Sequence, residues 1–214
     1  RLVIAAAARE LIPYIADAVP GWFQATLTLR DGQGREIGYD DDYRFHPDPV
    51  LFFSVPADGP YEIEIRDAIY RGREDFVYRI SVGELPFISS LFPLGGKAGE
   101  ATTVALSGWN LPAATLTAGS GANRSGVEML SVRKEGLVSN LMPFAVGTLP
   151  ECVETEPNND IAGAQAVARP IVVNGRIETP GDRDVFRIEG KKGDEVVAEV
   201  MARRLESPLD SVLT

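Results

Sequence analysis

Strict alternation of apolar and polar side chains is the feature that most constrains the fold of this chain. From residue 23 to residue 30 every second side chain is apolar, and the positions between them hold Gln, Thr and Arg. The same alternation recurs over residues 61–66 and 76–82. Because successive side chains of a β-strand point to opposite faces of a sheet, the pattern predicts half-buried strands. Turn sequences separate them, namely "DGQG" at 31–34 and "DG" at 58–59.

The remaining composition also favours strands over helices. The chain of 214 residues carries 21 Gly and 15 Pro, spread along its length, and it has no amphipathic helical pattern of three turns. A hydrophobic fraction of 44% is enough to bury a core in one large domain or in two or three small ones, which excludes a disordered chain. The sequence therefore predicts an all-β fold built from β-sandwich modules.

An internal repeat links the two ends of the chain. Residues 1–11 ("RLVIAAAAREL") align without gaps on residues 195–205 ("EVVAEVMARRL"), and residues 24–28 align on residues 210–214. The alanines of the first copy favour a helix by propensity alone, but the alternating valines of the second copy predict that both are strands. The chain thus begins inside one copy of a module and ends inside the next.

The repeat predicts three parts. Residues 1–84 form the later part of one module, residues 85–150 form a segment of different character, and residues 151–214 form the earlier part of a second module. A strand at an incomplete end lacks neighbours, and unpaired sheet edges are prone to association. We therefore expect the two partial modules to complement each other, within one chain or by segment swapping between chains.

Several stretches resemble known families. "ETEPNNDIAGAQAV" and "VNGRIETPGDRDVFRIEGKKGDEVVAEVMARRLESPLDSVLT" resemble the first part of the bacterial pre-peptidase C-terminal domain, a jelly-roll-like β-sandwich, and "LTLRDGQGREIGYDDD", "FSVPADGPYEIEIRD" and "YRGREDFVYRISVGE" resemble its later part. "ISSLFPLGGKAGEATTVALSGWNL" is similar to the immunoglobulin-like IPT/TIG module. The resemblance implies noncatalytic accessory modules of a secreted or cell-surface bacterial protein, with an extracellular protein or polysaccharide as partner. The alternative is a targeting or secretion-assisting region of a larger extracellular hydrolase.

Oxygen-bearing side chains are concentrated in "ETEPNND", residues 154–160. Gathered carboxylates need a counter-charge, and Ca²⁺ takes six to eight oxygen ligands with flexible geometry. Clostridial collagen-binding modules share the fold, and their likeness to this chain implies a calcium role for an acid- and amide-rich set: Glu154, Glu156, Asn158, Asn159, Asp182 and Asp184. At Asn159 that pattern prefers an aspartate, so we expect weaker affinity. The open alternative is a capping turn, in which Pro157 fixes the backbone and the Asn and Asp side chains bind nearby N–H groups.

Other function classes find little support in the sequence. The net charge is -10 and no cluster of Lys and Arg stands out, which argues against nucleic-acid binding. No apolar run reaches the ~20 residues of a membrane-spanning helix. His46 is the only histidine and Cys152 the only cysteine, so a nucleophilic enzyme, a disulfide framework and a cysteine zinc site are disfavoured. The acids Asp40, Asp41 and Asp42 indicate either a solvated hairpin end or a weak cation site.

Overall fold

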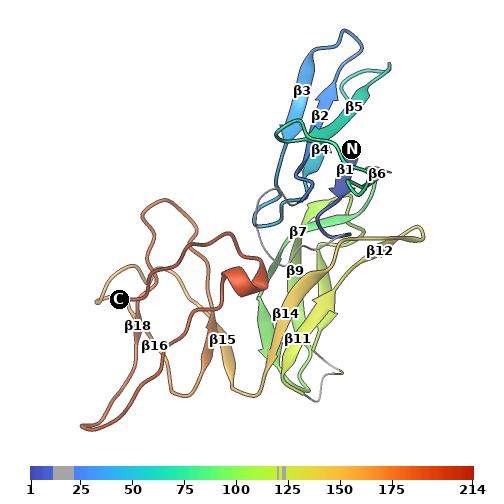
Figure 1. Ribbon diagram of the computed structural model, residues 1–214. Coiled ribbons are helices and arrows are strands. Elements are labelled where there is room, and N and C mark those ends of the chain that lie inside the picture. The colour runs from blue at the N-terminus through green and yellow to red at the C-terminus, as the bar shows by residue number, and fades with distance from the viewer. Residues whose placement is uncertain (12–21, 120, 122–123) are drawn as a thin grey trace. The chain divides into compact units, whose positions relative to one another are not determined.

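The computed structural model describes residues 1–11, 22–119, 121 and 124–214 (Figure 1). The chain divides into two compact units. Unit 1 comprises Arg1–Phe87, Gly108–Pro112 and Arg133–Ser139, and unit 2 comprises Ile88–Ser107, Ala113–Val132 and Asn140–Thr214. Residues 85–150 thus contribute to both units, and the predicted division into three modules stays a prediction.

Unit 1 contains two antiparallel sheets of three strands each (Figure 1). In the first sheet β1 is the central strand, and the order is β4 (Val50–Phe53), β1 (Leu2–Ala7) and β6 (Arg79–Gly83). In the second sheet β2 is central, and the order is β3 (Glu36–Asp40), β2 (Ala25–Arg30) and β5 (Glu62–Asp67). The short hairpin β12 (Arg133–Lys134) and β13 (Leu137–Val138) also belongs to unit 1.

The core of unit 1 consists of side chains from β1, β2 and β4. Ile4 and Leu27 are fully buried, and the cluster that they form is completed by small and branched residues of the same strands: Ala6, Leu29 and Leu51. These residues occupy alternate positions of their strands, as the period of two requires. Unit 1 is therefore a small β-sandwich, and the predicted all-β fold is confirmed there.

A buried carboxylate at the end of β5, that of Asp67, forms an ion pair with the partly exposed Arg71. The Asp67 carboxylate has no exposed surface, and it accepts hydrogen bonds from Arg71 Nε at 3.1 Å and from the backbone N–H groups of Gln24 and Arg71. Arg71 Nη2 donates to the Trp22 carbonyl at 2.7 Å. Burial alone would raise the pKa of Asp67, but the hydrogen bonds from Arg71 and the backbone lower it below its usual value. The pair ties the start of β2 to the end of β5.

Unit 2 contains two further sheets of three strands. One has the order β10 (Thr115–Ala118), β9 (Thr102–Trp109) and β7 (Phe87–Phe92), and the other has the order β11 (Gly126–Leu130), β14 (Met142–Gly147) and β8 (Gly95–Lys97). β10 pairs with β9 and β11 with β14 in antiparallel fashion, whereas β14 pairs with β8 in parallel. The strands bury a set of apolar side chains: Ile88, Leu91, Val104, Leu106, Met142, Phe144 and Val146.

The C-terminal part of unit 2 has little regular structure. β15 (Glu151–Val153) pairs in parallel with β17 (Val172–Asn174), and β16 (Gln165–Ala166) pairs in parallel with β18 (Phe186–Arg187). A 3-10 helix, η1 (Arg203–Leu205), is the one helical element among the described residues. No helix in the described part of the chain is long and apolar enough to cross a membrane.

The two copies of the internal repeat differ in structure. The first copy forms β1, as predicted, whereas residues 195–201 form no strand, so the strand prediction for the second copy is wrong. Val3 is 1% exposed in β1, but the aligned Val197 is 94% exposed. The physical reason is the neighbourhood: β1 lies between β4 and β6, and residues 195–201 pair with no strand of the described chain. Complementation between the partial modules stays a prediction.

Candidate metal centre

The loop that follows β15 is anchored at both ends. Parallel pairing of β15 with β17 brings the Glu154 backbone N–H within 2.9 Å of the Asn174 carbonyl. At the other end the Val185 N–H donates to the Asn158 carbonyl at 2.9 Å, next to Asp184. Between them, the Gln165 side chain accepts a hydrogen bond from the Thr155 N–H at 2.8 Å. The loop and the segment before β18 are therefore held side by side.

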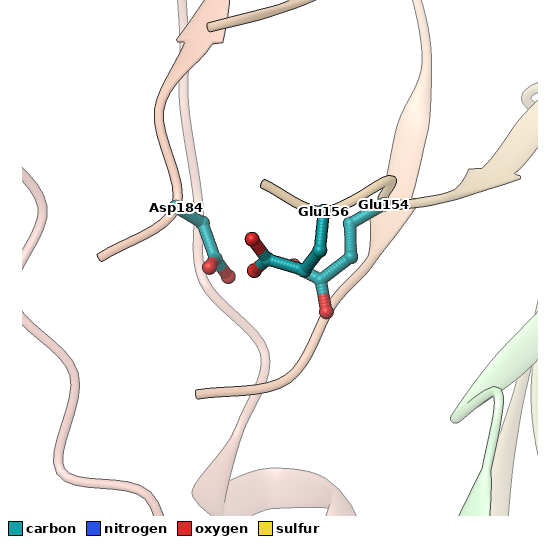
Figure 2. A group of neighbouring side chains, drawn as sticks. All are labelled: Glu154, Glu156 and Asp184. Carbon is teal, nitrogen blue, oxygen red and sulfur yellow. The ribbon is translucent and has the colours of Figure 1, made fainter. Parts of the chain in front are cut away.

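Three carboxylates meet where these two segments lie together. Glu154, Glu156 and Asp184 each offer one oxygen, and these oxygens lie within 4.8 Å of one another. Figure 2 shows the three carboxylates pointing toward a common point, with Glu154 and Glu156 on the loop and Asp184 on the facing segment. Among the described residues this is the only such group of three or more potential metal ligands from His, Cys, Asp and Glu. We refer to Glu154, Glu156 and Asp184 as the acidic cluster.

Two oxygens of the acidic cluster are buried without a hydrogen-bond donor. They are Glu154 Oε2 and Asp184 Oδ1, and no described group donates to either. The other oxygen of Glu154 accepts a short hydrogen bond from the Arg176 backbone N–H. A buried polar atom without a partner costs about 1–3 kcal/mol, and more when it is charged. The buried oxygens are thus the atoms that a bound cation would satisfy.

The electrostatics of the acidic cluster are those of negative groups with no counter-charge. Burial, together with the nearby Asp184 and Glu156, raises the pKa of Glu154 to about 7, against the lowering effect of the hydrogen bond from the Arg176 N–H. Burial also raises the pKa of Asp184, against the lowering effect of a side-chain hydrogen bond with Glu154, and the charges of Asp182 and Glu178 raise it as well. A carboxyl group with a raised pKa holds its proton near neutral pH, and a cation takes the place of that proton.

Asn158 supplies a further polar group beside the acidic cluster. Its side chain is 0% exposed, and its backbone N–H donates to Glu156 Oε2 at 3.0 Å. Its amide faces the two Glu156 carboxylate oxygens at 3.1 and 3.3 Å. With its nitrogen turned toward them the amide donates to Glu156, and with its oxygen turned toward them it adds a neutral ligand for a cation.

Gly175 lies directly against the acidic cluster. A Cβ atom at this position would lie 2.7 Å from Glu154 Oε2 and 3.1 Å from Asp184 Oδ2. Any larger residue would therefore push apart the two carboxylates that hold the buried oxygens. Close approach of backbone to a site is one of the roles that only glycine fills.

Two of the six residues implied by the resemblance lie outside the acidic cluster. The Asn159 side-chain oxygen accepts a hydrogen bond from the Arg183 N–H at 3.2 Å. The Asp182 carboxylate accepts one from the Glu178 N–H at 2.7 Å and thereby closes the turn before Asp184. Asp160 likewise accepts from the Gly163 N–H at 2.8 Å. The structure thus brings together Glu154, Glu156, Asn158 and Asp184. Asn159 and Asp182 instead accept hydrogen bonds from backbone N–H groups next to the acidic cluster.

The second acidic segment, in unit 1, uses its carboxylates differently. Asp40 Oδ2 accepts a hydrogen bond from the Val50 N–H at 2.7 Å, and burial raises the pKa of Asp40 to about 6, with a further contribution from Asp42 and Asp41. His46 pairs through its backbone with Tyr43. The flanking strands β3 and β4 belong to different sheets, and the solvated hairpin end or weak cation site at Asp40, Asp41 and Asp42 stays a prediction.

The sequence did not predict the three residues that lie against the acidic cluster, Asn174, Gly175 and Arg176. Asn174 is buried and its carbonyl accepts from Glu154, Gly175 leaves room for two carboxylates, and the Arg176 N–H donates to Glu154. The one sequence signal is the "NG" pair at residues 174–175, a dipeptide typical of turns. Two of these three interactions use backbone atoms, which the identity of a side chain does not reveal.

The donor set determines which ions can bind. The acidic cluster and Asn158 offer only oxygen atoms, and neither sulfur nor imidazole is among the grouped ligands. Such a set suits the hard cations Ca²⁺, Mg²⁺ and Mn²⁺, and flexible loop ligands with mixed carboxylates and amides suit Ca²⁺ best. No family model, curated protein or solved structure matches this chain.

Proposed function

We propose that this chain is a noncatalytic array of β-sandwich modules from a secreted or cell-surface bacterial protein, and that Ca²⁺ stabilises its C-terminal part. The observation that carries the proposal is the acidic cluster, in which Glu154 Oε2 and Asp184 Oδ1 are buried with no donor among the described groups. Calcium bound there would neutralise the carboxylates and satisfy both oxygens. Its other ligands would be Glu156, Asn158 and water.

Binding of this kind would stabilise the folded module. A ligand that binds only the folded state contributes free energy that rises with its concentration, about 2.7 kcal/mol at a hundredfold excess over Kd. Residues 151–202 contain only short two-stranded sheets, so their folded state depends on few backbone hydrogen bonds. An ion that joins the loop of Glu154 and Glu156 to the segment of Asp184 would crosslink two parts of this region.

The noncatalytic part of the proposal rests on the single cysteine and the single histidine of the chain, Cys152 and His46. Burial raises the pKa of the Cys152 thiol, with Glu151 adding to the effect, which disfavours the reactive thiolate. His46 belongs to unit 1 and Cys152 to unit 2. An adhesive or spacer role beside other domains fits this chain better than turnover of a substrate.

Calorimetric titration of chelator-stripped protein with CaCl₂ tests the proposal. We expect saturable binding with one ion per chain, lost in Glu154→Gln and strongly weakened in Glu156→Gln. Glu189→Gln is the matched control, because it makes the same chemical change at an exposed position of unit 2 outside the acidic cluster. Absence of binding to the wild-type chain, or equal loss in the control, would refute the calcium site.

Asp182→Asn tests the extent of the ligand set. Because the Asp182 carboxylate closes a turn through the Glu178 N–H, we expect this variant to lower affinity only modestly. An amide oxygen can still accept that hydrogen bond. A loss as large as that of Glu154→Gln would instead make Asp182 a direct ligand, as the family resemblance implies.

A further inference from the structure

The segment Asn174–Gly175–Arg176 has two sets of contacts within unit 2. On one side Asn174 Oδ1 accepts a hydrogen bond from the Leu94 N–H at 3.0 Å, and the Arg176 guanidinium lies 3.8 Å from the centre of the Phe92 ring. Phe92 ends β7 and Leu94 precedes β8, so both belong to the immunoglobulin-like part of the chain. The Asn174 side chain, 8% exposed, also donates to Glu151 Oε2 at 2.8 Å.

On its other side the same segment supports the acidic cluster. The Asn174 carbonyl accepts from the Glu154 N–H at 2.9 Å, and the Arg176 N–H donates to the Glu154 carboxylate. Gly175, between them, has no room for a Cβ against Glu154 and Asp184. Three consecutive residues therefore contact the acidic cluster through their backbone, and two of them contact the turn of Phe92 and Leu94 through their side chains.

We infer that cation binding at the acidic cluster and docking of the Phe92–Leu94 turn on Asn174 and Arg176 are coupled, so that each stabilises the other. The inference rests on the proposed calcium site. An ion that fixes Glu154 and Asp184 also fixes the backbone of 174–176, which presents Asn174 Oδ1 and the Arg176 guanidinium in the docked position. Calcium would then stiffen the connection between the immunoglobulin-like part and the C-terminal part of unit 2.

Thermodynamic linkage makes the coupling testable from either side. If the ion strengthens docking by a given factor, docking strengthens ion binding by the same factor. A substitution in the turn, which holds none of the carboxylates of the acidic cluster, should therefore weaken calcium binding. A change of charge alone would not weaken calcium binding in either variant. Phe92→Leu leaves the charge of the protein unchanged. Arg176→Gln removes a positive charge near the site, which by itself would strengthen the binding of a cation.

The experiment uses the full 214-residue chain and calcium alone as the probe. Calorimetry should show a Kd for Ca²⁺ raised about two- to fivefold in Phe92→Leu and in Arg176→Gln, the size of one lost cation–π contact. Arg187→Gln, an exposed arginine on β18, should leave the Kd unchanged. Hydrogen exchange followed by mass spectrometry should show slower exchange of a peptide containing Leu94 when calcium replaces chelator.

The outcomes separate the two proposals. If the wild-type chain takes up no calcium, both the proposed function and the coupling are wrong. If the wild-type chain binds calcium but Leu94 exchanges at the same rate with and without it, and both Phe92→Leu and Arg176→Gln keep the wild-type Kd, the coupling alone is refuted. Arg176→Gln keeps the test decisive if Phe92→Leu fails to fold, since Arg176 extends from a loop and its backbone N–H is retained.

Discussion

Removing one charge from the acidic cluster should stabilise the metal-free protein while it abolishes calcium binding. The variant is Asp184→Asn, which keeps the size of the side chain and replaces a carboxylate oxygen with an amide donor. That donor can bond an oxygen of Glu154, which belongs to the same cluster. Opposite effects on stability and on binding are expected of a cation site. They are not expected of a capping turn, in which the carboxylate itself stabilises the fold.

The magnitude follows from the separation of the charges. Two unit charges 4.8 Å apart repel by about 0.9 kcal/mol in water and by about 3.5 kcal/mol at an effective dielectric constant of about 20. Asp184 is half-buried and water screens part of the repulsion, so we expect about 1–2 kcal/mol of stabilisation at pH 8. For a chain of this length each kcal/mol corresponds to about 2–4 °C in Tm.

The pH dependence gives a second signature of the same interaction. Glu154 has its pKa raised from 4.5 to about 7 in the folded state, so the folded state holds this proton more tightly than the unfolded state does. The corresponding stability is fully present below about pH 4.5 and is lost as the pH rises through 7. In Asp184→Asn the pKa of Glu154 falls back toward its usual value, and this decline should flatten between pH 5 and 8.

The assay is thermal unfolding in chelator and in calcium at pH 8 and at pH 5.5. Asp210→Asn is the control, since it makes the same change at an exposed position of unit 2. We expect a higher Tm for Asp184→Asn than for wild type in chelator, and no further rise on adding calcium. A lower Tm in chelator at pH 8, with unchanged pH dependence, would contradict the reasoning and support the capping turn.

Three predictions concern unit 1 and the internal repeat. Asp67→Ala leaves the Arg71 guanidinium and several N–H groups without their buried acceptor, and urea unfolding should show a loss of about 3–5 kcal/mol; a loss below 1 kcal/mol would contradict it. Leu27→Ala opens a cavity in the core, and the same assay should give a loss of about 2–5 kcal/mol. Val3→Ala should destabilise by about 1–3 kcal/mol while Val197→Ala stays within about 0.5 kcal/mol; equal losses would mean that residues 195–201 are paired in solution as β1 is.

Local sequence patterns correctly predicted the strands and turns that depend mainly on local interactions. The strand over residues 25–30 follows from alternation, and the turn at 31–34 follows from its residues, with the Asp31 carboxylate accepting the Gln33 N–H. Residues 195–201 are rich in valine but form no strand, because a strand exists only when neighbouring strands complete its hydrogen-bond ladder. The identity of those neighbours is not contained in the segment itself.

The candidate metal site was likewise predictable from the sequence only in part. Residues 154, 156 and 158 alternate on an extended loop, so their convergence was predictable, and the resemblance supplied Asp184. The orientation of Asn159 and Asp182 toward backbone N–H groups depends on turn geometry that the sequence does not specify. The role of Asn174 was out of reach, because its partner Leu94 lies 80 residues earlier in the chain.

The position of β1 at the centre of its sheet has a consequence for the rate of folding. β1 pairs Leu2 with Phe53 on one side and Val3 with Gly83, about 80 residues further along, on the other. The β2–β3 hairpin, by contrast, closes over a short turn at Asp31. Since the entropy of closing a long loop is lost before its contacts form, we expect the hairpin to form early and the β4-β1-β6 sheet to form late. Unit 1 should therefore fold slowly for its size, with insertion of β1 as the step that completes the sandwich.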